Sequence, residues 1–222
     1  MSVDGTGFAA YCEAIYELAE DDLDVIQARI ADRLGVSRPA VSEMVRRMAA
    51  DGLVTVDGKI RLTPAGIALA ERIVRRHRLA ERFLTDVLGL AWAEAHHQAG
   101  RWEHVIDETV EAAMDRVLGR PTTCPHGNPI PGSDYRESPA VPLADLEVGA
   151  DFTVRRIPEE LEFAPGVLEF LEDNTVQPGR SGRITATSPD GSVTVRIEDR
   201  VVGLGTFASQ RILVEPVPVG VS

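Results

Sequence analysis

Apolar side chains recur three and four positions apart through the first part of the chain, which predicts amphipathic helices over 8–20 and 25–34. A third helix should follow over 38–50. Ser37 suits its N-cap, and Pro39 lies in its first turn, where a missing N–H is harmless. Three short helices with a glycine turn before the third indicate a helix–turn–helix.

The pattern then changes to short apolar segments. Asp57-Gly58 separates 53–56 from 59–62, which is the strongest short-range signal for a β-hairpin. Together with the preceding helices, this hairpin predicts a winged helix–turn–helix. Helical spacing resumes over 64–88 and again over 92–118, where one or two further helices are expected.

A stretch rich in proline and glycine, 119–142, cannot form a regular helix or a central strand. Beyond it the pattern predicts a small barrel with a helix over 167–173 and strands over 151–157, 182–187, 192–198 and 210–214. We therefore expect a mainly α protein with a small β domain. Its expected parts are a winged helix–turn–helix domain (1–63), a helical domain (64–120), a linker (121–145) and the β domain (146–222).

The composition is that of a globular protein. The chain has 222 residues, 44% of them hydrophobic, which is enough for a real core. No apolar run is long enough to span a bilayer, and the acidic N-terminus does not resemble a signal peptide. Two cysteines, Cys12 and Cys124, are too few for a disulfide framework and fit a reducing, cytoplasmic setting.

The net charge of −12 by itself argues against a nucleic-acid partner. Its distribution changes that conclusion. Residues 25–62 carry seven bases and four acids, a net charge of +3, whereas residues 1–24 carry seven acids and no base. The basic segment coincides with the predicted helix–turn–helix, as contact with phosphates requires.

The third helix is narrow enough to enter the major groove of DNA. Arg46 and Arg47 could hold phosphates, and Glu43 could accept a hydrogen bond from cytosine. The alternative is a helix pair that mediates only protein contacts. One such motif reads little sequence, so we expect a homodimer on a double-stranded DNA operator. The candidate DNA-contacting residues are Gln27, Arg29, Ser37, Arg38, Pro39, Ser42, Glu43, Arg46, Arg47, Lys59 and Arg61.

All five histidines lie between residues 77 and 126. His77 and Glu81, four positions apart on a predicted helix, share a face, and so do His96 and Glu103, seven positions apart. Imidazole and carboxylate groups suit divalent first-row ions, and a thiolate adds softness. The candidate ligands in this region are His77, Glu81, His96, Glu103, His104, Cys124 and His126.

Other interpretations stay open at this point. An enzyme is not expected, because the chain has no HExxH motif and no obvious general base beside an open site. A winged-helix regulator with a structural metal and a small organic effector is the main alternative, although aromatic residues to line an effector cavity are few. His97 is expected to be a surface histidine, and Cys12 a small apolar residue of the first helix.

Seven segments extend this interpretation: AIYELAED (14–21), QARIADRLGVSRPAVSEMVRRM (27–48), DGLV (51–54), LTPAG (62–66), RRHRLAERFLTDVLGL (75–90), GRWEHVI (100–106) and HGNPIPG (126–132). Together they resemble the diphtheria toxin repressor family of iron- and manganese-dependent transcriptional repressors. The resemblance spans almost the whole chain. It implies a winged-helix domain, a helical dimerisation domain and a C-terminal SH3-like (FeoA-like) domain. It also implies a repressor of metal-homeostasis genes activated by Mn²⁺ or Fe²⁺, for which Zn²⁺, Co²⁺, Ni²⁺ or Cd²⁺ could substitute in vitro.

The resemblance implies two metal sites in each subunit. The ligands implied for the first are His77, Glu81 and His96 from the helices, Glu159 and Glu162 from the β domain and, by similarity to a manganese-sensing streptococcal branch, Cys124 and His126. Seven donors exceed the coordination sphere of one transition ion. Either two ions bind, or some of these residues orient the ligands from behind.

The second implied site departs from the family pattern. Glu103 and His104 match it, but Ala10 and Gly100 stand where the family has Met or Asp and Cys or Glu. Neither alanine nor glycine can ligate through a side chain. Glu13, one helical turn from Ala10, matches a carboxylate that the manganese branch uses.

The implied switch depends on charge. Without metal, the carboxylates of Glu13, Glu81, Glu103, Glu159 and Glu162 are expected to crowd as unpaired negative charges and to loosen the surrounding helices. A divalent cation would neutralise them, order the dimer and fix the spacing of its recognition helices.

Overall fold

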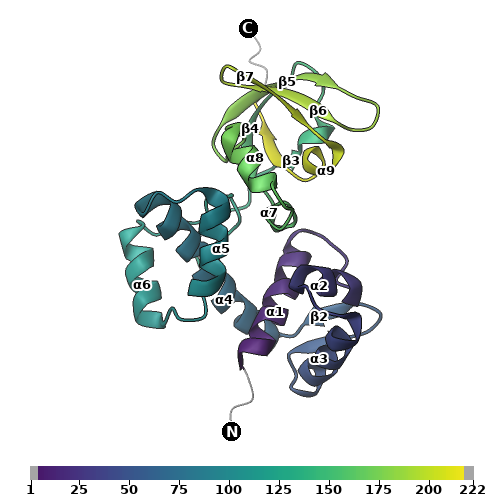
Figure 1. The fold of residues 1–222 in the computed structure, drawn as a ribbon, viewed down its shortest axis with the longest axis vertical. Coiled ribbons are helices and arrows are strands. Elements are labelled where there is room, and N and C mark those ends of the chain that lie inside the picture. Colours follow the sequence, from purple (N-terminus) through teal and green to yellow (C-terminus); the bar gives the residue numbers. More distant parts are fainter. Residues whose placement is uncertain (1–4, 218–222) are drawn as a thin grey trace.

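The computed structural model describes residues 5–217, which form three units along the chain (Figure 1). The first, drawn in purple and blue, is the winged helix–turn–helix. The second, in teal, is a group of helices, and the third, in green and yellow, is the β domain. Each unit has a hydrophobic core of its own. The predicted mainly α architecture with a small β domain is therefore confirmed.

The first unit has the predicted elements. They are α1 (Gly5–Glu20), α2 (Gln27–Leu34), α3 (Arg38–Ala50), β1 (Val54–Val56) and β2 (Ile60–Leu62). Helix α2 begins two residues later than expected and ends at Gly35, which has a φ of 63°. Ser37 caps α3 by accepting a hydrogen bond from the Ala40 N–H (3.3 Å). The hairpin pairs Val54 with Leu62 across the Asp57-Gly58 turn.

The second unit is built on a long helix. Its elements are α4 (Pro64–Arg82), the π-helical turn η1 (Phe83–Val87), α5 (Trp92–Trp102) and α6 (Glu108–Val117). Helix α4 starts against the first unit at Gly66, where an added Cβ would lie 2.1 Å from the Leu53 carbonyl oxygen. The single helix expected over 64–88 is wrong in its last turn, because the chain changes there from α to π spacing.

The third unit is a curled antiparallel sheet. Its elements are β3 (Val141–Pro142), the 3₁₀ turn η2 (Leu143–Asp145), β4 (Asp151–Arg156), α7 (Glu159–Glu162), α8 (Val167–Asp173), β5 (Ser181–Thr187), β6 (Val193–Ile197), β7 (Arg200–Leu204), α9 (Thr206–Ser209) and β8 (Leu213–Pro216). The strand order is β3-β8-β4-β5-β6-β7. Register shifts between Val154 and Arg156 and between Ile184 and Ala186 mark irregularities that bend the sheet.

Three expectations for this unit need correction. Strand β7 was not predicted, and the last strand begins at Leu213 rather than at 210, because 206–209 form a helical turn. The short helix α7 was not predicted either. It projects from the β domain toward the other two units, as the green ribbon in Figure 1 shows.

Polar contacts hold the β domain against the rest of the molecule. Arg156 Nη2 donates to Asp21 Oδ1 at 2.6 Å, and the Glu160 N–H donates to Asp21 Oδ2 at 3.0 Å. The Trp92 N–H at the start of α5 donates to Glu172 Oε2 of α8 at 2.9 Å. No helix among the described residues is long and apolar enough to cross a membrane.

Candidate metal centre

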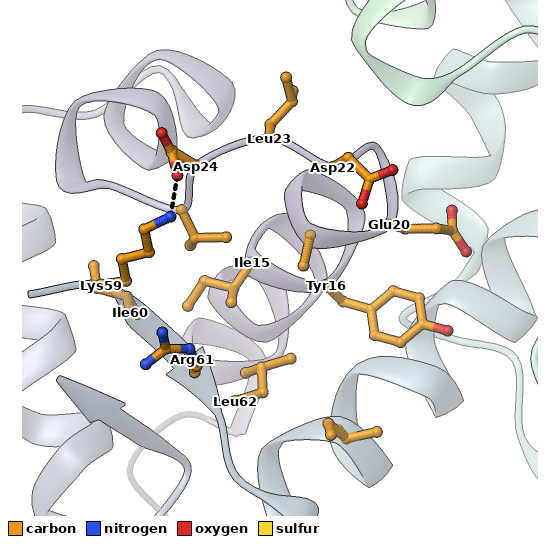
Figure 2. Close-up of a pocket in the computed structure, with 13 residues that line it drawn as sticks. Ile15, Tyr16, Glu20, Asp22, Leu23, Asp24, Lys59, Ile60, Arg61 and Leu62 are labelled. Carbon is orange, nitrogen blue, oxygen red and sulfur yellow. Dashed lines mark hydrogen bonds and ion pairs between the residues drawn. The ribbon is translucent and has the colours of Figure 1, made fainter. Parts of the chain in front are cut away.

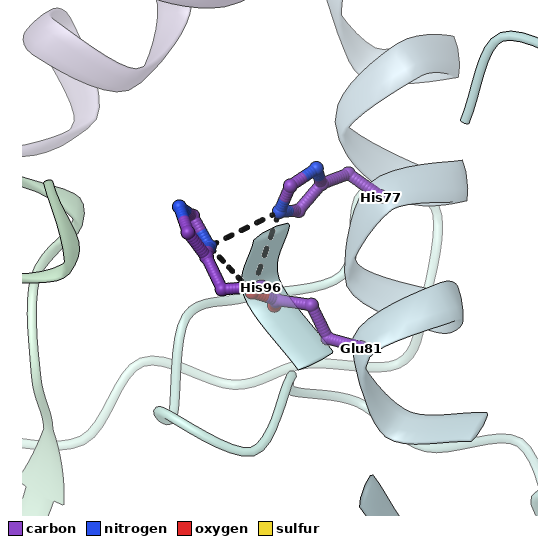
Figure 3. Close-up of side chains that lie close together, drawn as sticks. All are labelled: His77, Glu81 and His96. Carbon is purple, nitrogen blue, oxygen red and sulfur yellow. Dashed lines mark hydrogen bonds and ion pairs between the residues drawn. The ribbon is translucent and has the colours of Figure 1, made fainter. Parts of the chain in front are cut away.

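Helices α4 and α5 bring three candidate ligands together. His77 and Glu81 lie one turn apart on α4, and His96 faces them from α5 (Figure 3). Glu81 Oε1 lies 2.8 Å from His96 Nδ1 and 3.3 Å from His77 Nε2. These two imidazole nitrogens are 3.4 Å apart. The i, i+4 spacing on α4 therefore aims both side chains at one point.

A tight turn in the linker adds two more donors. It closes through the Cys124 N–H, which donates to the Asn128 carbonyl (2.9 Å), and the Gly127 N–H, which donates to the Cys124 carbonyl (3.0 Å). Gly127 has a φ of 89°, and a Cβ there would lie 2.1 Å from a backbone oxygen of β4. His126 Nδ1 lies 3.8 Å from Cys124 Sγ and 3.6 Å from Glu81 Oε1. Only glycine at position 127 allows the linker turn to lie this close to β4.

Helix α7 brings carboxylates from the β domain. Glu162 Oε2 lies 2.9 Å from His126 Nδ1 and 3.2 Å from His96 Nδ1. Its Oε1 accepts a hydrogen bond from Asn128 Nδ2 at 2.5 Å. Glu159 has an oxygen within 4.8 Å of ligand atoms of His96 and Glu162. We call the whole set the Glu81 cluster: His77, Glu81, His96, Cys124, His126, Glu159 and Glu162.

Arg78 ties this cluster to the DNA-binding unit, and the sequence analysis missed it. The guanidinium is fully buried. It donates to Glu20 of α1 (2.6 Å), to Glu159 of α7 (2.9 Å) and to the Pro129 carbonyl of the linker. In the sequence Arg78 is one of several arginines of α4, so nothing distinguished it from a surface charge.

Several polar atoms of the cluster are buried without a partner. Glu81, Cys124 and His126 are fully buried. Among residues 5–217, no hydrogen-bond partner is found for Glu81 Oε2, Glu159 Oε2 or His126 Nε2. A buried polar atom left unpaired costs about 1–3 kcal/mol. Imidazole, carboxylate and thiol donors converging on such atoms fit a divalent first-row cation.

The electrostatics of the cluster are those of buried ion pairs. Burial disfavours a charged imidazole, but carboxylates outweigh it and raise the pKa of His96 to about 10 through Glu162 and Glu81. The pKa values of His77 and His126 are raised in the same way. Burial likewise disfavours charged Glu81 and Glu162, yet the imidazoles lower the pKa of both. The histidines and the two carboxylates thus each favour their charged forms.

The expected crowd of unpaired negative charges is therefore wrong. Glu159 pairs with Arg78, and Glu103 pairs with His77. Burial, followed by the charge of Glu103, raises the pKa of Glu13 to about 8, so this acid keeps its proton at neutral pH. The acids expected to repel one another are held by basic partners or are uncharged, because the chain folds histidines and an arginine among them.

At the Cys124 thiol, burial and the neighbouring carboxylates act in the same direction. Burial raises the pKa of Cys124 well above its usual value, and the carboxylates of Glu81 and Glu162 raise it further. A thiol in this position stays protonated unless a cation lies against it.

A smaller group shares His77. His77 Nδ1 lies 2.6 Å from Glu103 Oε2, and Glu13 of α1 has an oxygen within 4.8 Å of both ligand atoms. We call Glu13, His77 and Glu103 the Glu103 cluster. It borders a pocket of about 410 Å³, where Ala10 and Gly100 offer no side-chain donor. The presence of Ala10 and Gly100 in place of ligating residues therefore leaves open space beside these three donors.

The remaining candidates lie outside both clusters. The side chain of His104 is 38% exposed, and its Nε2 is 3.5 Å from Glu103 Oε1. It joins no group of donors within 4.8 Å of one another among the described residues. His97 is exposed, and Cys12 is fully buried in the core of the first unit, as expected.

The candidate DNA-contacting residues lie on α2, α3 and the hairpin. All are exposed except Arg29 and Ser42, which are partly buried. Lys59 forms an exposed ion pair with Asp24 at 2.5 Å. Such surface pairs contribute about 0–1 kcal/mol, so a phosphate could replace the carboxylate at little cost.

A pocket of about 650 Å³ lies between α1 and the hairpin (Figure 2). Its lining is mainly aliphatic, and Tyr16 is its aromatic side chain. The charged groups Glu20, Lys59 and Arg61 at its border each have an ion-pair partner. It therefore presents few free polar groups to orient an organic effector.

Comparison with known proteins bears on the helix–turn–helix unit and on the helical unit that carries the metal ligands. Residues 8–61 match the family model described as the iron dependent repressor N-terminal DNA binding domain. Residues 63–132 match that of the iron dependent repressor metal binding and dimerisation domain. The chain belongs to the iron-dependent repressor family. The members of this family are transcriptional repressors, which bind DNA rather than act as enzymes.

Individual members are similar over most of their length. The iron-dependent repressor IdeR of Mycobacterium tuberculosis is 42% identical over 201 residues, which cover 84% of this chain and 86% of the relative. The diphtheria toxin repressor of Corynebacterium diphtheriae is 48% identical over 126 residues, 56% of each chain. A solved manganese-dependent transcriptional repressor in complex with manganese has a TM-score of 0.85 at 33% identity and covers 95% of this chain and all of its own. The resemblance inferred from motifs is thus confirmed.

Proposed function

We propose that this member of the iron-dependent repressor family represses metal-homeostasis genes in the cytoplasm and binds its operator only when Mn²⁺ or Fe²⁺ occupies the Glu81 cluster. The observation that carries the proposal is the convergence of donors from α4, α5, the linker and α7 around Glu81 and His96. The Glu103 cluster, with His104 at its edge, would be a second site that lacks too many donors to hold a cation of its own. A bound cation would supply positive charge among the carboxylates of this cluster.

The proposal includes a route from this centre to DNA. His77 and Arg78 are neighbours on α4, and Arg78 pairs with Glu20 at the end of α1. Helix α1 forms one core with α2 and α3, so its position decides where α3 points. Holding α4, α7 and the linker together around a cation would keep Arg78 in place and thereby reduce the motion of α1.

The same proposal assigns roles along the chain. Residues 1–63 would bind DNA, 64–120 would bind metal and form the homodimer, 121–145 would link, and 146–222 would close the metal centre. The residues proposed to contact DNA are Gln27, Arg29, Ser37, Arg38, Pro39, Ser42, Glu43, Arg46, Arg47, Lys59 and Arg61. Two copies of α3 in one dimer would read successive major grooves of a duplex operator.

Fluorescence anisotropy on DNA from the upstream region of the gene tests the proposal. Chelator-stripped protein at fixed salt should bind weakly, and anaerobic Mn²⁺ or Fe²⁺ should tighten binding at least about 10-fold. His77→Ala should abolish this response. Glu94→Gln, which removes an exposed α5 carboxylate whose one side-chain hydrogen bond within residues 5–217 comes from Gln98, should retain it.

Equal DNA binding with and without cations would contradict the proposal. The pocket between α1 and the hairpin would then become the place to seek a small organic effector.

A further inference from the structure

We propose that Phe163 is a positioning residue that transmits occupancy of the metal centre to α2, the helix that supports α3 in the helix–turn–helix. Its aromatic ring contacts both His96 of α5 and Arg33 of α2. This inference rests on the proposed function insofar as it takes the Glu81 cluster to bind the cation. It adds a second route to DNA, separate from the one through Arg78 and α1.

Phe163 packs between units of the molecule and not inside one of them. Its residue surface is 47% exposed, and it belongs to none of the three hydrophobic cores formed by residues 5–217. The ring centroid lies 5.2 Å from that of His96, with the two planes at 89°, and 4.2 Å from Arg33 Cζ. Edge-to-face aromatic pairs and a guanidinium over a ring are both attractive arrangements. The ring therefore joins the β domain to the helical unit and to the helix–turn–helix unit.

Two proposed metal ligands hold this ring from one side. Glu162 directly precedes Phe163 in the chain, and the Phe163 N–H donates to the Glu159 carbonyl at 3.1 Å, which closes α7. Glu162 Oε2 also lies 3.2 Å from His96 Nδ1. If a cation held Glu162 and His96, both the backbone of Phe163 and the imidazole packed against its ring would be fixed together.

Arg33 holds the ring from the DNA-binding unit. Its Nη1 donates to Glu17 Oε2 of α1 at 2.7 Å, and both side chains are only 5% exposed. This carboxylate orients the flat guanidinium, which can stack on an aromatic ring as a lysine ammonium cannot. Ile30 of α2 and Val41 of α3 belong to one core, so a displacement of α2 displaces α3.

Open space surrounds the contact between Arg33 and Phe163. Both residues line a cavity of about 410 Å³ that reaches His77, and both line another of about 380 Å³ that reaches Leu18. A side chain with cavities beside it is not locked by close packing. The position of the ring therefore depends on its imidazole and guanidinium partners, and a change at one partner is felt at the other.

The β domain contains a matched control for this contact. Arg211 Cζ lies 4.2 Å from the centroid of the Phe207 ring, the same distance as in the pair of Arg33 and Phe163. Phe207 is 43% exposed, and both members of its pair belong to the β domain. Phe207→Leu thus removes the same kind of interaction without removing a link between units.

Operator binding, Mn²⁺ binding and amide hydrogen exchange of the full chain together test the inference. In Phe163→Leu, the Mn²⁺ affinity from calorimetry should stay within about 3-fold of the wild type, whereas Mn²⁺ should tighten operator binding by less than about 3-fold instead of about 10-fold. Mn²⁺ should slow amide exchange over 27–34 in the wild type and not in this variant. Phe163→Tyr keeps the ring and should retain both responses. Arg33→Lys keeps the charge but not the flat guanidinium, and should behave like Phe163→Leu.

Three results in the variants would overturn the inference: a full Mn²⁺ response in Phe163→Leu, a Mn²⁺ affinity that falls together with the response, or an equal loss in Phe207→Leu. Exchange over 27–34 in the wild type needs no variant, and a rate that ignores Mn²⁺ would also overturn it. If Mn²⁺ slows this exchange only when Phe163 is present but operator binding ignores Mn²⁺, the proposed function fails and this inference stands. If Mn²⁺ controls operator binding equally in the wild type and Phe163→Leu, the reverse holds.

Discussion

The Glu81 cluster and the Glu103 cluster share one imidazole and differ in nearly everything else. His77 directs Nε2 at Glu81 and Nδ1 at Glu103, so the same side chain belongs to both. The first cluster draws donors from four parts of the chain, whereas the second has lost two to Ala10 and Gly100 and borders a pocket. The completeness of the donor set, rather than burial, is what favours the first cluster as the proposed metal centre.

The largest expected effect comes from the shared carboxylate of the first cluster. Glu81→Gln keeps the volume but removes the negative charge, so Mn²⁺ affinity should fall by about 100-fold. Isothermal titration calorimetry measures this affinity, and Glu94→Gln, the same change at an exposed carboxylate, is the control. A change of less than about 3-fold would mean that Glu81 does not hold a cation.

A smaller effect should come from Glu103. Its carboxylate accepts from His77 Nδ1 and thereby orients Nε2 toward Glu81, so Glu103→Gln should weaken Mn²⁺ binding by about 10-fold. His104→Ala removes the neighbouring exposed imidazole and should change nothing. Equal losses in both variants would indicate that His104 and Glu103 act together as ligands, and that the Glu103 cluster is more complete than its geometry suggests.

Restoring a donor should narrow the difference between the clusters. A Cβ added at Gly100 meets no atom within 4 Å, so Gly100→Glu fits beside Glu103. One further cation should bind per chain, and the helix should gain up to about 1 kcal/mol. Gly100→Ala gives the helical gain without a donor and is the matched control. An ion count that stays the same in both variants would show that the pocket cannot close around a cation.

The smallest effect on cation binding is expected from Asp21. This residue affects the Glu81 cluster only indirectly, because it holds the β domain in place through Arg156 and Glu160. Burial, opposed by Arg156, raises its pKa to about 7 from 3.8. The folded protein then binds more protons than the unfolded chain between these values. Its free energy of unfolding should therefore decrease as pH rises through that window, by at most about 1.4 kcal/mol per pH unit.

Asp21→Asn should flatten this dependence. Urea denaturation of the chelator-treated protein at about pH 4.5, 5.5 and 6.5, which lie within that window, measures the slope of the unfolding free energy against pH. Parallel curves for the wild type and the variant would rule out a raised pKa at Asp21.

Local signals predicted the elements that depend on local structure. The Asp57-Gly58 turn, the Ser37 cap and the helical spacing of 8–20 all concern contacts within a few residues, and each was confirmed. Strand β7 and helix α7 were missed, although β7 is no shorter than β6, which was predicted. Their stability comes from packing in the β domain rather than from their own periodicity.

Among the candidate ligands, the sequence by itself determined one pair carried by a single helix, whereas His96 and Glu103, also expected to share a face, fall in different clusters. His77 and Glu81 share a face because α-helical geometry places residues four apart on one side. Only the tertiary structure decided that Cys124 and Glu162, far from α4 in the chain, both lie beside His126, which is itself next to Glu81. It also decided that Arg78 is a buried tie and not a surface charge. Such long-range placement depends on how whole units dock, and no local spacing of residue types encodes that.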